Sequence, residues 1–223
     1  TRRYGANKIR GLQLQDWGVT WDEIEPSFDA FEYLCGISGK AGNIKGALQP
    51  GGNPFESPRA REYPNPPLKT GYPPMLFDKV ARELGYHPFP QPTANLSRPY
   101  VNPLGIAMGE CTYCGFCERF GCANYSKASA QTTILPVLMT KPNFEARTEC
   151  EVLKVNLTAD GKAAKSVTYV DARGVEYEQP GEMVLICAYS LMNVRMMRRS
   201  GIGTQYGPAT GKGNVGRNYC YQT

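Results

Sequence analysis

A chain of 223 residues with 41% hydrophobic content is long enough to form one large domain or two small ones around a hydrophobic core. Its mean hydropathy is −0.42 and no apolar run approaches the roughly 18 residues that a bilayer requires, so membrane association is expected only through a partner. The net charge of +5 comes from 25 basic and 20 acidic residues scattered along the chain, which argues against a nucleic-acid-binding face.

An amphipathic helix is predicted near residue 20. The sequence T-W-D-E at residues 20–23 has the form of a capping box, in which each end of the motif binds the other's backbone N–H. Apolar residues then recur every three or four positions as far as Leu34, and Gly36 provides a stop. Pro26 falls inside this helix, so we expect it to kink or divide the helix.

The stretch 38–72 is rich in glycine and proline, which predicts a long irregular segment of the kind that covers a site or contacts a partner. A second helix is predicted over residues 73–85, because proline is favoured at a helix start and glycine at its end. Its apolar residues share one face, which we expect to lie in the core: Leu76, Phe77, Val80 and Leu84.

Strand-like runs predominate in the second half of the chain. A short helix is predicted at 134–139, followed by strands at 145–148, 151–157, 166–170, 175–177 and 183–187. The middle strands read as an antiparallel meander, and the continuous apolar run 183–187 is typical of a strand covered on both faces in a parallel sheet. A helix with a methionine-rich apolar stripe then ends at Ser200. The expected class is α/β, in the mixed α+β sense.

Two familiar signals are discounted. His87, the single histidine, lies in an extended segment without an orienting partner, so we expect a structural role and no catalytic residue within this stretch of sequence. The sequence G-K-G-N-V-G at residues 211–216 fits a dinucleotide fingerprint, but no strand precedes it and no helix can follow it. We interpret it as a loop.

Four cysteines lie close together at Cys111, Cys114, Cys117 and Cys122. Thiolates at such intervals can converge on an iron–sulfur cluster or a zinc ion. The C-x2-C-x2-C start matches the bacterial ferredoxin run, although the last interval is x4 and no proline follows. A cluster with three protein ligands would leave one cysteine spare, and zinc would take all four. The remaining alternative is a turn without metal whose thiols are buried or joined as a disulfide. The spacing favours a cluster.

Several stretches carry a resemblance to a known family. D-W-G-V-T-W-D-E-I-E-P at 16–26, with G-I-S-G at 36–39, is similar to W-P-x-x-Y-x-x-L-E-P … G-x-S-G. The region 115–129 resembles C-G-x-C … G-C … A-K-x-S, and 143–155 resembles N-x … V-x-x-V. Residues 188–203 and V-G-R-N at 215–218 resemble a signature helix ending in S-G-I-G and the V-G-x-N after it. Together they resemble the glucose–methanol–choline (GMC) oxidoreductases, in particular flavoprotein subunits of gluconate 2-dehydrogenase-like enzymes.

The resemblance implies an FAD enzyme that oxidises a CH–OH group of a sugar acid, sugar or polyol. In the family the backbone of a strand valine meets the adenine side of FAD, and Val152 is the matching position. The helix dipole and loop at Ser200 to Gly203, with Asn218 beyond it, would help to shape the flavin domain. The catalytic histidine, with its histidine or asparagine partner, is expected beyond the C-terminus, so this segment alone is expected to be inactive.

The same resemblance implies partners. Dehydrogenases of this branch pass electrons through a 3Fe–4S cluster to a cytochrome c subunit, which would give three of the four clustered cysteines a use. A small subunit is also expected, with a periplasmic location and membrane association through these partners.

We therefore expect an internal segment of such an enzyme. Residues 1–128 would belong to the substrate or cap side, with the cysteine loop at 111–122, and residues 129–223 to the middle of an FAD-binding domain with a parallel sheet and an antiparallel meander. The sequence departs from the family at Asn193, where Ser-Pro is usual, and at Gln222, where many members have histidine. The alternatives are a GMC enzyme without a cluster and a metal-binding or electron-transfer module without flavin.

Overall fold

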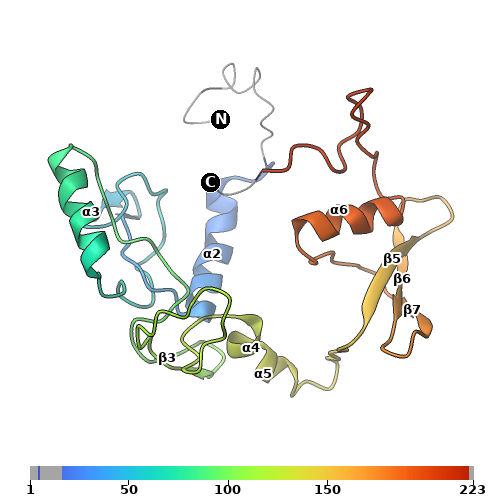
Figure 1. Ribbon diagram of the computed structural model, residues 1–223, viewed down its shortest axis with the longest axis horizontal. Coiled ribbons are helices and arrows are strands. Elements are labelled where there is room, and N and C mark those ends of the chain that lie inside the picture. The colour runs from blue at the N-terminus through green and yellow to red at the C-terminus, as the bar shows by residue number, and fades with distance from the viewer. Residues whose placement is uncertain (1–4, 6–16, 221–223) are drawn as a thin grey trace. The chain divides into compact units, whose positions relative to one another are not determined.

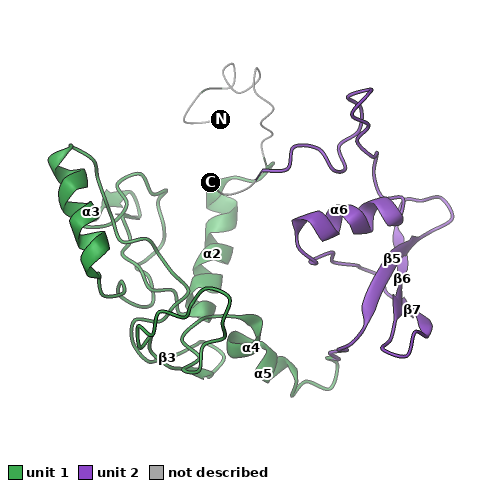
Figure 2. Ribbon diagram, in the orientation of Figure 1, with its two compact units in different colours: residues 1–144 green, residues 145–223 purple. Residues whose placement is uncertain are grey.

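The computed structural model describes Gly5 and residues 17–220 (Figure 1). Two residues of the family comparison, Asp16 and Gln222, lie outside this described part. The chain divides into two compact units, an N-terminal unit of residues 1–144 and a C-terminal unit of residues 145–223 (Figure 2). The assignment of 1–128 to a cap side and 129–223 to a flavin domain stays a prediction.

Helix α2, Trp21–Cys35, begins at the predicted capping box. The Thr20 N–H donates to Glu23 Oε2 at 2.7 Å, and the Glu23 N–H donates to Thr20 Oγ1 at 3.3 Å. Pro26 does not divide the helix, which is continuous, because the N–H that it lacks would serve only a first-turn carbonyl at an exposed end. Gly36 ends the helix in the left-handed conformation, as predicted.

The irregular segment after α2 is held by charged side chains. A short hairpin of β1, Asn43–Ile44, and β2, Ala47–Leu48, lies within it. Arg59 is only 6% exposed and forms ion pairs with Glu32 and Glu56, and its guanidinium lies 3.7 Å from the Tyr63 ring centroid. The sequence reading of scattered charges missed this buried network, whose partners are far apart in the chain.

Helix α3, Tyr72–Glu83, starts with proline at its first positions and is followed by Gly85 in the left-handed conformation, as predicted. The prediction that its apolar face forms core was wrong. Only Ala81 of this helix is buried, because no described element packs over the remaining apolar residues. The exposed residues are Leu76, Phe77, Val80 and Leu84.

The rest of the N-terminal unit consists of short elements around Leu96, which is fully buried. Strands β3, Tyr100–Val101, and β4, Ala107–Met108, pair antiparallel. The helix predicted at 134–139 is found as two short helices, α4, Ala130–Thr133, and α5, Leu135–Leu138. The break falls where Ile134 leaves helical geometry and Pro136 starts a new turn.

The C-terminal unit is an antiparallel meander with one helix. Strands β5, Glu151–Leu157, β6, Ala164–Val170, and β7, Glu176–Pro180, lie in the order β5-β6-β7. Helix α6, Ser190–Arg199, packs against β5 (Figure 1). The predicted meander and signature helix are thus confirmed.

Two of the predicted strands are absent from the described residues. Residues 145–148 and 183–187 are irregular, and Met183 and Leu185 are each 80% exposed. An apolar run adopts a buried strand only where neighbouring strands supply ladder partners, and every strand pair described here is antiparallel. The mixed α/β class is therefore seen with small sheets and without the expected parallel sheet.

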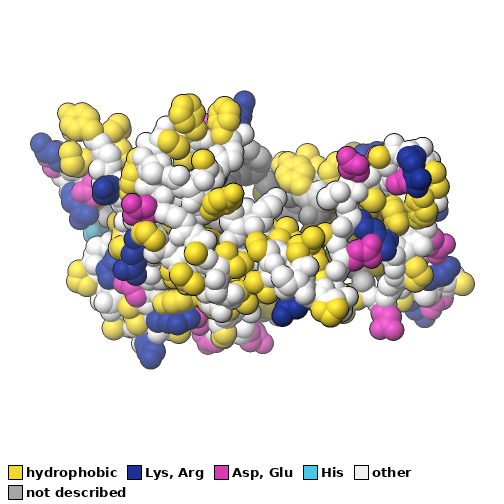
Figure 3. All heavy atoms as spheres, turned by 90° about the horizontal axis from the view of Figure 1, so that it is seen from below, with side chains coloured by type: hydrophobic (Ala, Val, Ile, Leu, Met, Phe, Trp, Pro, Cys, Tyr) yellow, Lys and Arg dark blue, Asp and Glu magenta, His cyan; other side chains and the backbone are white. Residues whose placement is uncertain are grey.

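Hydrophobic side chains lie on the surface in many places, as the face drawn in Figure 3 shows. None of the described helices is both long enough and apolar enough to cross a membrane.

Candidate functional site

The open edge of β5 is the feature that best fits the predicted cofactor contact. Within the described residues β5 pairs only with β6, so its other edge has no strand partner. One amide on that edge is satisfied by α6, because the Val155 N–H donates to Ser200 Oγ at 2.8 Å. The remaining backbone groups of this edge can serve a ligand.

The strand register indicates which way Val152 faces. Val155 lies opposite Val167 but donates its N–H to Ser200, so these two residues form a pair without hydrogen bonds between them. The N–H and C=O of Val167 therefore point away from β5 and toward β7. Tyr169, two residues along β6, faces the same way because backbone direction alternates along a strand. Val152 lies opposite Tyr169, and its N–H and C=O therefore point to the open edge.

Beside Val152 the sheet carries a shallow hollow of about 370 Å³, in which Arg147 is the central polar group. Its guanidinium donates to Tyr169 Oη at 3.1 Å and to Gln179 Oε1 at 2.8 Å. It also binds Glu145, and this hydrogen bond lowers the pKa of the Glu145 carboxyl below its usual value. The side chain of Val152 is 42% exposed in this hollow, so both its backbone and its side chain are accessible.

The segment after α6 folds back along the helix. A Cβ atom on Gly216 would lie 3.4 Å from Val194 Cγ1, and Tyr219 Oη lies 3.5 Å from Tyr189 Oη. Asn218, between these two contacts, is exposed and has a φ of 55° in the left-handed region, which asparagine tolerates better than most residues. Helix α6 therefore touches β5 at its C-terminal end and the Asn218 segment at its N-terminal half.

The cysteine loop, residues 111–122, lies in the N-terminal unit. All four of its thiols are free, with Cys114 and Cys117 exposed and Cys111 and Cys122 half-buried. Because all four are free, no disulfide closes the loop, and Cys117 Sγ accepts a hydrogen bond from Asn95 Nδ2 at 3.4 Å. The disulfide alternative is therefore excluded for this structure.

One thiol of the loop is electrostatically distinct. Burial acts to raise the pKa of Cys122, but backbone N–H groups of Lys127, Ser126 and Asn124 donate to its sulfur. These hydrogen bonds and the charge of Lys127 outweigh burial, so the pKa of this thiol lies below its ordinary value.

The clustered thiols do not form a metal site with one another or with nearby carboxylates among the described residues. Across Gly5 and residues 17–220 no group of three or more His, Cys, Asp or Glu side chains is arranged to hold a metal ion. The four thiols thus do not fit an iron–sulfur cluster or a tetrahedral zinc in this geometry, since both need convergent sulfur ligands. The assignment of three of them to a cluster stays a prediction from sequence.

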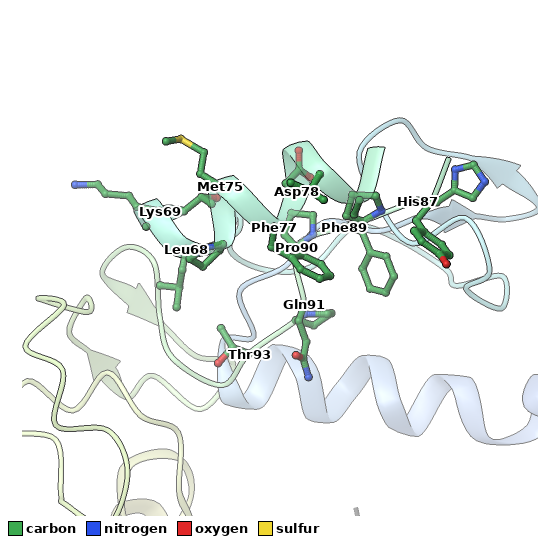
Figure 4. Close-up of a pocket in the computed structure, with 18 of the residues that line it drawn as sticks. Leu68, Lys69, Met75, Phe77, Asp78, His87, Phe89, Pro90, Gln91 and Thr93 are labelled. Carbon is green, nitrogen blue, oxygen red and sulfur yellow. The ribbon is translucent and has the colours of Figure 1, made fainter. Parts of the chain in front are cut away.

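A larger open groove of about 1350 Å³ lies along α3 in the N-terminal unit. Figure 4 shows its labelled residues coming from α3, from the segment before it and from the segment after it. The lining is mostly apolar and includes Phe77, Val80 and Phe89. His87 lies at this groove with its ring 6.1 Å from that of Phe55, and its side chain makes no hydrogen bond within the described part of the chain.

Sequence reasoning placed Ser200 in the loop that ends the signature helix but missed its bond to β5, and it missed Arg147 altogether. Ser200 stands in the S-G-I-G motif, which could have drawn attention to it, but its bond to β5 joins residues 45 apart in sequence. No sequence signal distinguishes Arg147 from the other basic residues.

Comparison with known proteins identifies the family. The profile of the GMC oxidoreductases matches residues 96–223, which is more than half of the chain and includes the cysteine loop, β5 and α6. The chain belongs to the GMC oxidoreductase family. Within it, the gluconate 2-dehydrogenase flavoprotein of Pantoea cypripedii is 46% identical over 224 residues, covering 99% of this chain and 36% of that protein.

Two more distant relatives match most of the chain. The 2-methyl-1,2-propanediol dehydrogenase of Mycolicibacterium austroafricanum is 27% identical over 91% of this chain and 34% of its own length. The 6'''-hydroxyparomomycin C oxidase of Streptomyces lividus is 24% identical over 92% of this chain and 35% of its own length. The chain thus spans about a third of the length of the relatives it matches.

Proposed function

We propose that this chain belongs to an FAD-dependent dehydrogenase that oxidises a CH–OH group of a sugar acid, sugar or polyol. Membership of the GMC family supports the reaction class. The 46% identity to a gluconate 2-dehydrogenase flavoprotein favours a sugar acid over the diol and the aminoglycoside named by the more distant relatives. The single observation within the structure that carries the proposal is the open edge of β5 at Val152.

The fit of FAD to this edge rests on backbone chemistry. The N–H and C=O of Val152 form a donor and an acceptor on one edge, which complements the adjacent acceptor and donor of an adenine ring. The hollow beside Val152 offers room for a planar ring. Asn218 would act from the segment that follows α6, where its side chain is exposed. Bound FAD would supply the acceptor for the hydride of the alcohol carbon, and a base would have to take the hydroxyl proton.

The predicted 3Fe–4S cluster is a separate matter, because its donors do not converge among the described residues. Four free thiols without a shared centre favour the alternative of a GMC enzyme without a cluster. Iron and acid-labile sulfide per chain, measured on native polypeptide purified without oxygen, decide between the two. About three irons would support ligation by three cysteines, whereas values near zero would support the alternative.

The cytochrome c and small subunits, the periplasmic location and membrane association through these subunits are proposed from the same resemblance. The similarity to a protein named as a flavoprotein of gluconate 2-dehydrogenase supports an enzyme of several subunits. Copurification of a haem-bearing polypeptide with the native protein would support the cytochrome, and a flavoprotein that purifies alone at full activity with the native acceptor would oppose it.

The substrate proposal is tested by anaerobic reduction. Gluconate added to the native polypeptide without oxygen should bleach the absorbance of the bound oxidised flavin. A matched addition of hexanoate, the six-carbon carboxylate without hydroxyl groups, should leave it unchanged because hexanoate has no CH–OH group. Bleaching by none of gluconate, glucose and a polyol would contradict the proposed reaction.

A further inference from the structure

Ser200 joins the two parts of the C-terminal unit that the proposed function assigns to FAD. Its hydroxyl accepts a hydrogen bond from the Val155 N–H at 2.8 Å and donates one to Met196 O at 2.7 Å. We propose that Ser200 is a positioning residue for the adenine contact, fixing α6 on the edge of β5 beside Val152. This inference rests on the proposed FAD function and goes beyond it by naming a residue that never touches the cofactor.

The hydroxyl is well suited to this task because it uses both of its hydrogen-bonding capacities inside the protein. The bond to Met196 O lies within the last turn of α6, so the direction of the side chain is fixed relative to the helix. The bond to Val155 then fixes the helix end relative to β5. Ser200 is half-buried, so water competes less for either bond than at an exposed site.

This link also defines which part of the strand edge is left for a ligand. Ser200 occupies the amide of Val155, so that group cannot bind adenine. Val152 lies beyond the irregularity in register between Val152 and Lys154, and its backbone groups remain open. The edge is therefore divided into a part closed by α6 and a part available to the cofactor.

Helix α6 extends this effect to Asn218. The segment 216–219 contacts the N-terminal half of α6 through Gly216 beside Val194 and through Tyr219 beside Tyr189. Anchoring the C-terminal end of α6 at β5 thus also sets where the Asn218 segment lies relative to Val152. Loss of the anchor is expected to loosen both proposed contacts together.

The test compares FAD with FMN, which lacks the adenine. Dissociation constants of both flavins are measured by fluorescence titration of the deflavinated native polypeptide carrying Ser200→Ala, Ser200→Thr or no substitution. Ser200→Ala should weaken FAD binding by about three- to tenfold, the worth of one hydrogen bond, and leave FMN binding unchanged. Ser200→Thr keeps the hydroxyl and should restore FAD affinity.

A matched control removes a hydroxyl elsewhere in the same sheet. Ser166 is fully buried on β6, where it hydrogen-bonds Asn156 and Glu178 and does not touch the open edge of β5. Ser166→Ala should destabilise the sheet while keeping the ratio of FAD to FMN affinity. An independent readout is hydrogen exchange at the Val155 amide without flavin. It should accelerate in Ser200→Ala by more than any loss of sheet stability accounts for, and in Ser166→Ala only by that loss.

The possible results distinguish the role of Ser200 from the proposed contact with the adenine of FAD. If the native polypeptide prefers FAD and Ser200→Ala loses this preference while Ser200→Thr keeps it, the positioning role is supported. If Ser200→Ala keeps the native preference, the role of Ser200 is overturned and the FAD proposal stands. If the native polypeptide binds FMN as tightly as FAD, the adenine contact itself is overturned, and the role of Ser200 with it.

Discussion

Replacing Arg59 with methionine tests how the irregular segment after α2 is held in place. The guanidinium is 6% exposed, and the two carboxylates that it pairs with, Glu32 and Glu56, are each 17% exposed. Arg59→Met leaves both part-buried carboxylates without their cation, and breaking a buried ion pair in this way costs about 3–5 kcal/mol. At about 1.4 kcal/mol per factor of ten, the local opening equilibrium should rise by roughly a hundredfold to a few thousandfold.

Native-state hydrogen exchange measures this opening directly. The amides of Ala41 and Gly42 report on it, because each donates to a carboxylate of the same region, Ala41 to Glu62 and Gly42 to Glu56, at 2.5 Å. Protection factors at both amides should fall by roughly a hundredfold to a few thousandfold. The fall ends where exchange through global unfolding becomes the faster route.

An exposed ion pair supplies the control. Arg82 binds Asp78 four residues earlier on α3, with side chains 58% and 44% exposed, and such a pair contributes only about 0.3–0.5 kcal/mol. Arg82→Met should leave the Ala41 and Gly42 amides unchanged. Exchange in Arg59→Met that stays within about threefold of native would refute the reasoning that this buried network holds the segment, since even one net hydrogen bond is worth about that much.

The remaining predictions concern the cofactor edge and the same segment. Val152→Pro removes an N–H from the open edge and should weaken FAD binding by about three- to tenfold in a titration. Val152→Ala keeps the backbone N–H and should bind FAD as tightly as the native protein does. Equal loss of FAD affinity in both variants would oppose the backbone contact. Burial acts to raise the pKa of Glu62, but hydrogen bonds from Lys40 and from backbone N–H groups keep it below its ordinary 4.5. A carboxyl whose pKa is lower in the folded state stabilises the fold at pH values above its unfolded-state pKa, and this stabilisation is lost as the pH falls through its folded-state pKa. The thermal midpoint should therefore drop more steeply below pH 4.5 in native protein than in Glu62→Gln. Gly42→Ala would drive a Cβ atom into the carbonyl oxygen of Asn53, so it should speed proteolysis of residues 38–65. An unchanged cleavage rate would contradict the tight backbone approach.

Local signals predicted the elements that depend on neighbours in sequence. The capping box at Thr20, the stop at Gly36 and the bounds of β5 were correct because capping, glycine conformation and alternating residues act within a few positions. The core face of α3 and the buried strand at 183–187 were wrong because burial depends on what covers a face, and periodicity carries no information about that.

In the candidate site, too, local features were predictable from the sequence and contacts between distant residues were not. The position of Val152 on a strand was predictable, but its place on an open edge follows from the order of strands in the sheet. Ser200 acts through a contact with β5 that sequence spacing does not reveal. The cysteine spacing predicted ligands that converge, whereas the actual loop directs Cys114 and Cys117 outward. The spacing of the cysteines limits which of them could share a metal, and the backbone conformation of the loop decides whether their sulfur atoms converge.

The flavin content of the native polypeptide tests the central claim most directly. The protein is purified from its source, denatured, and the released flavin is separated and quantified per chain. We expect about one flavin per chain, released as FAD, because the adenine contact proposed at Val152 selects the dinucleotide. A native polypeptide that carries no flavin, or only FMN, would contradict the account.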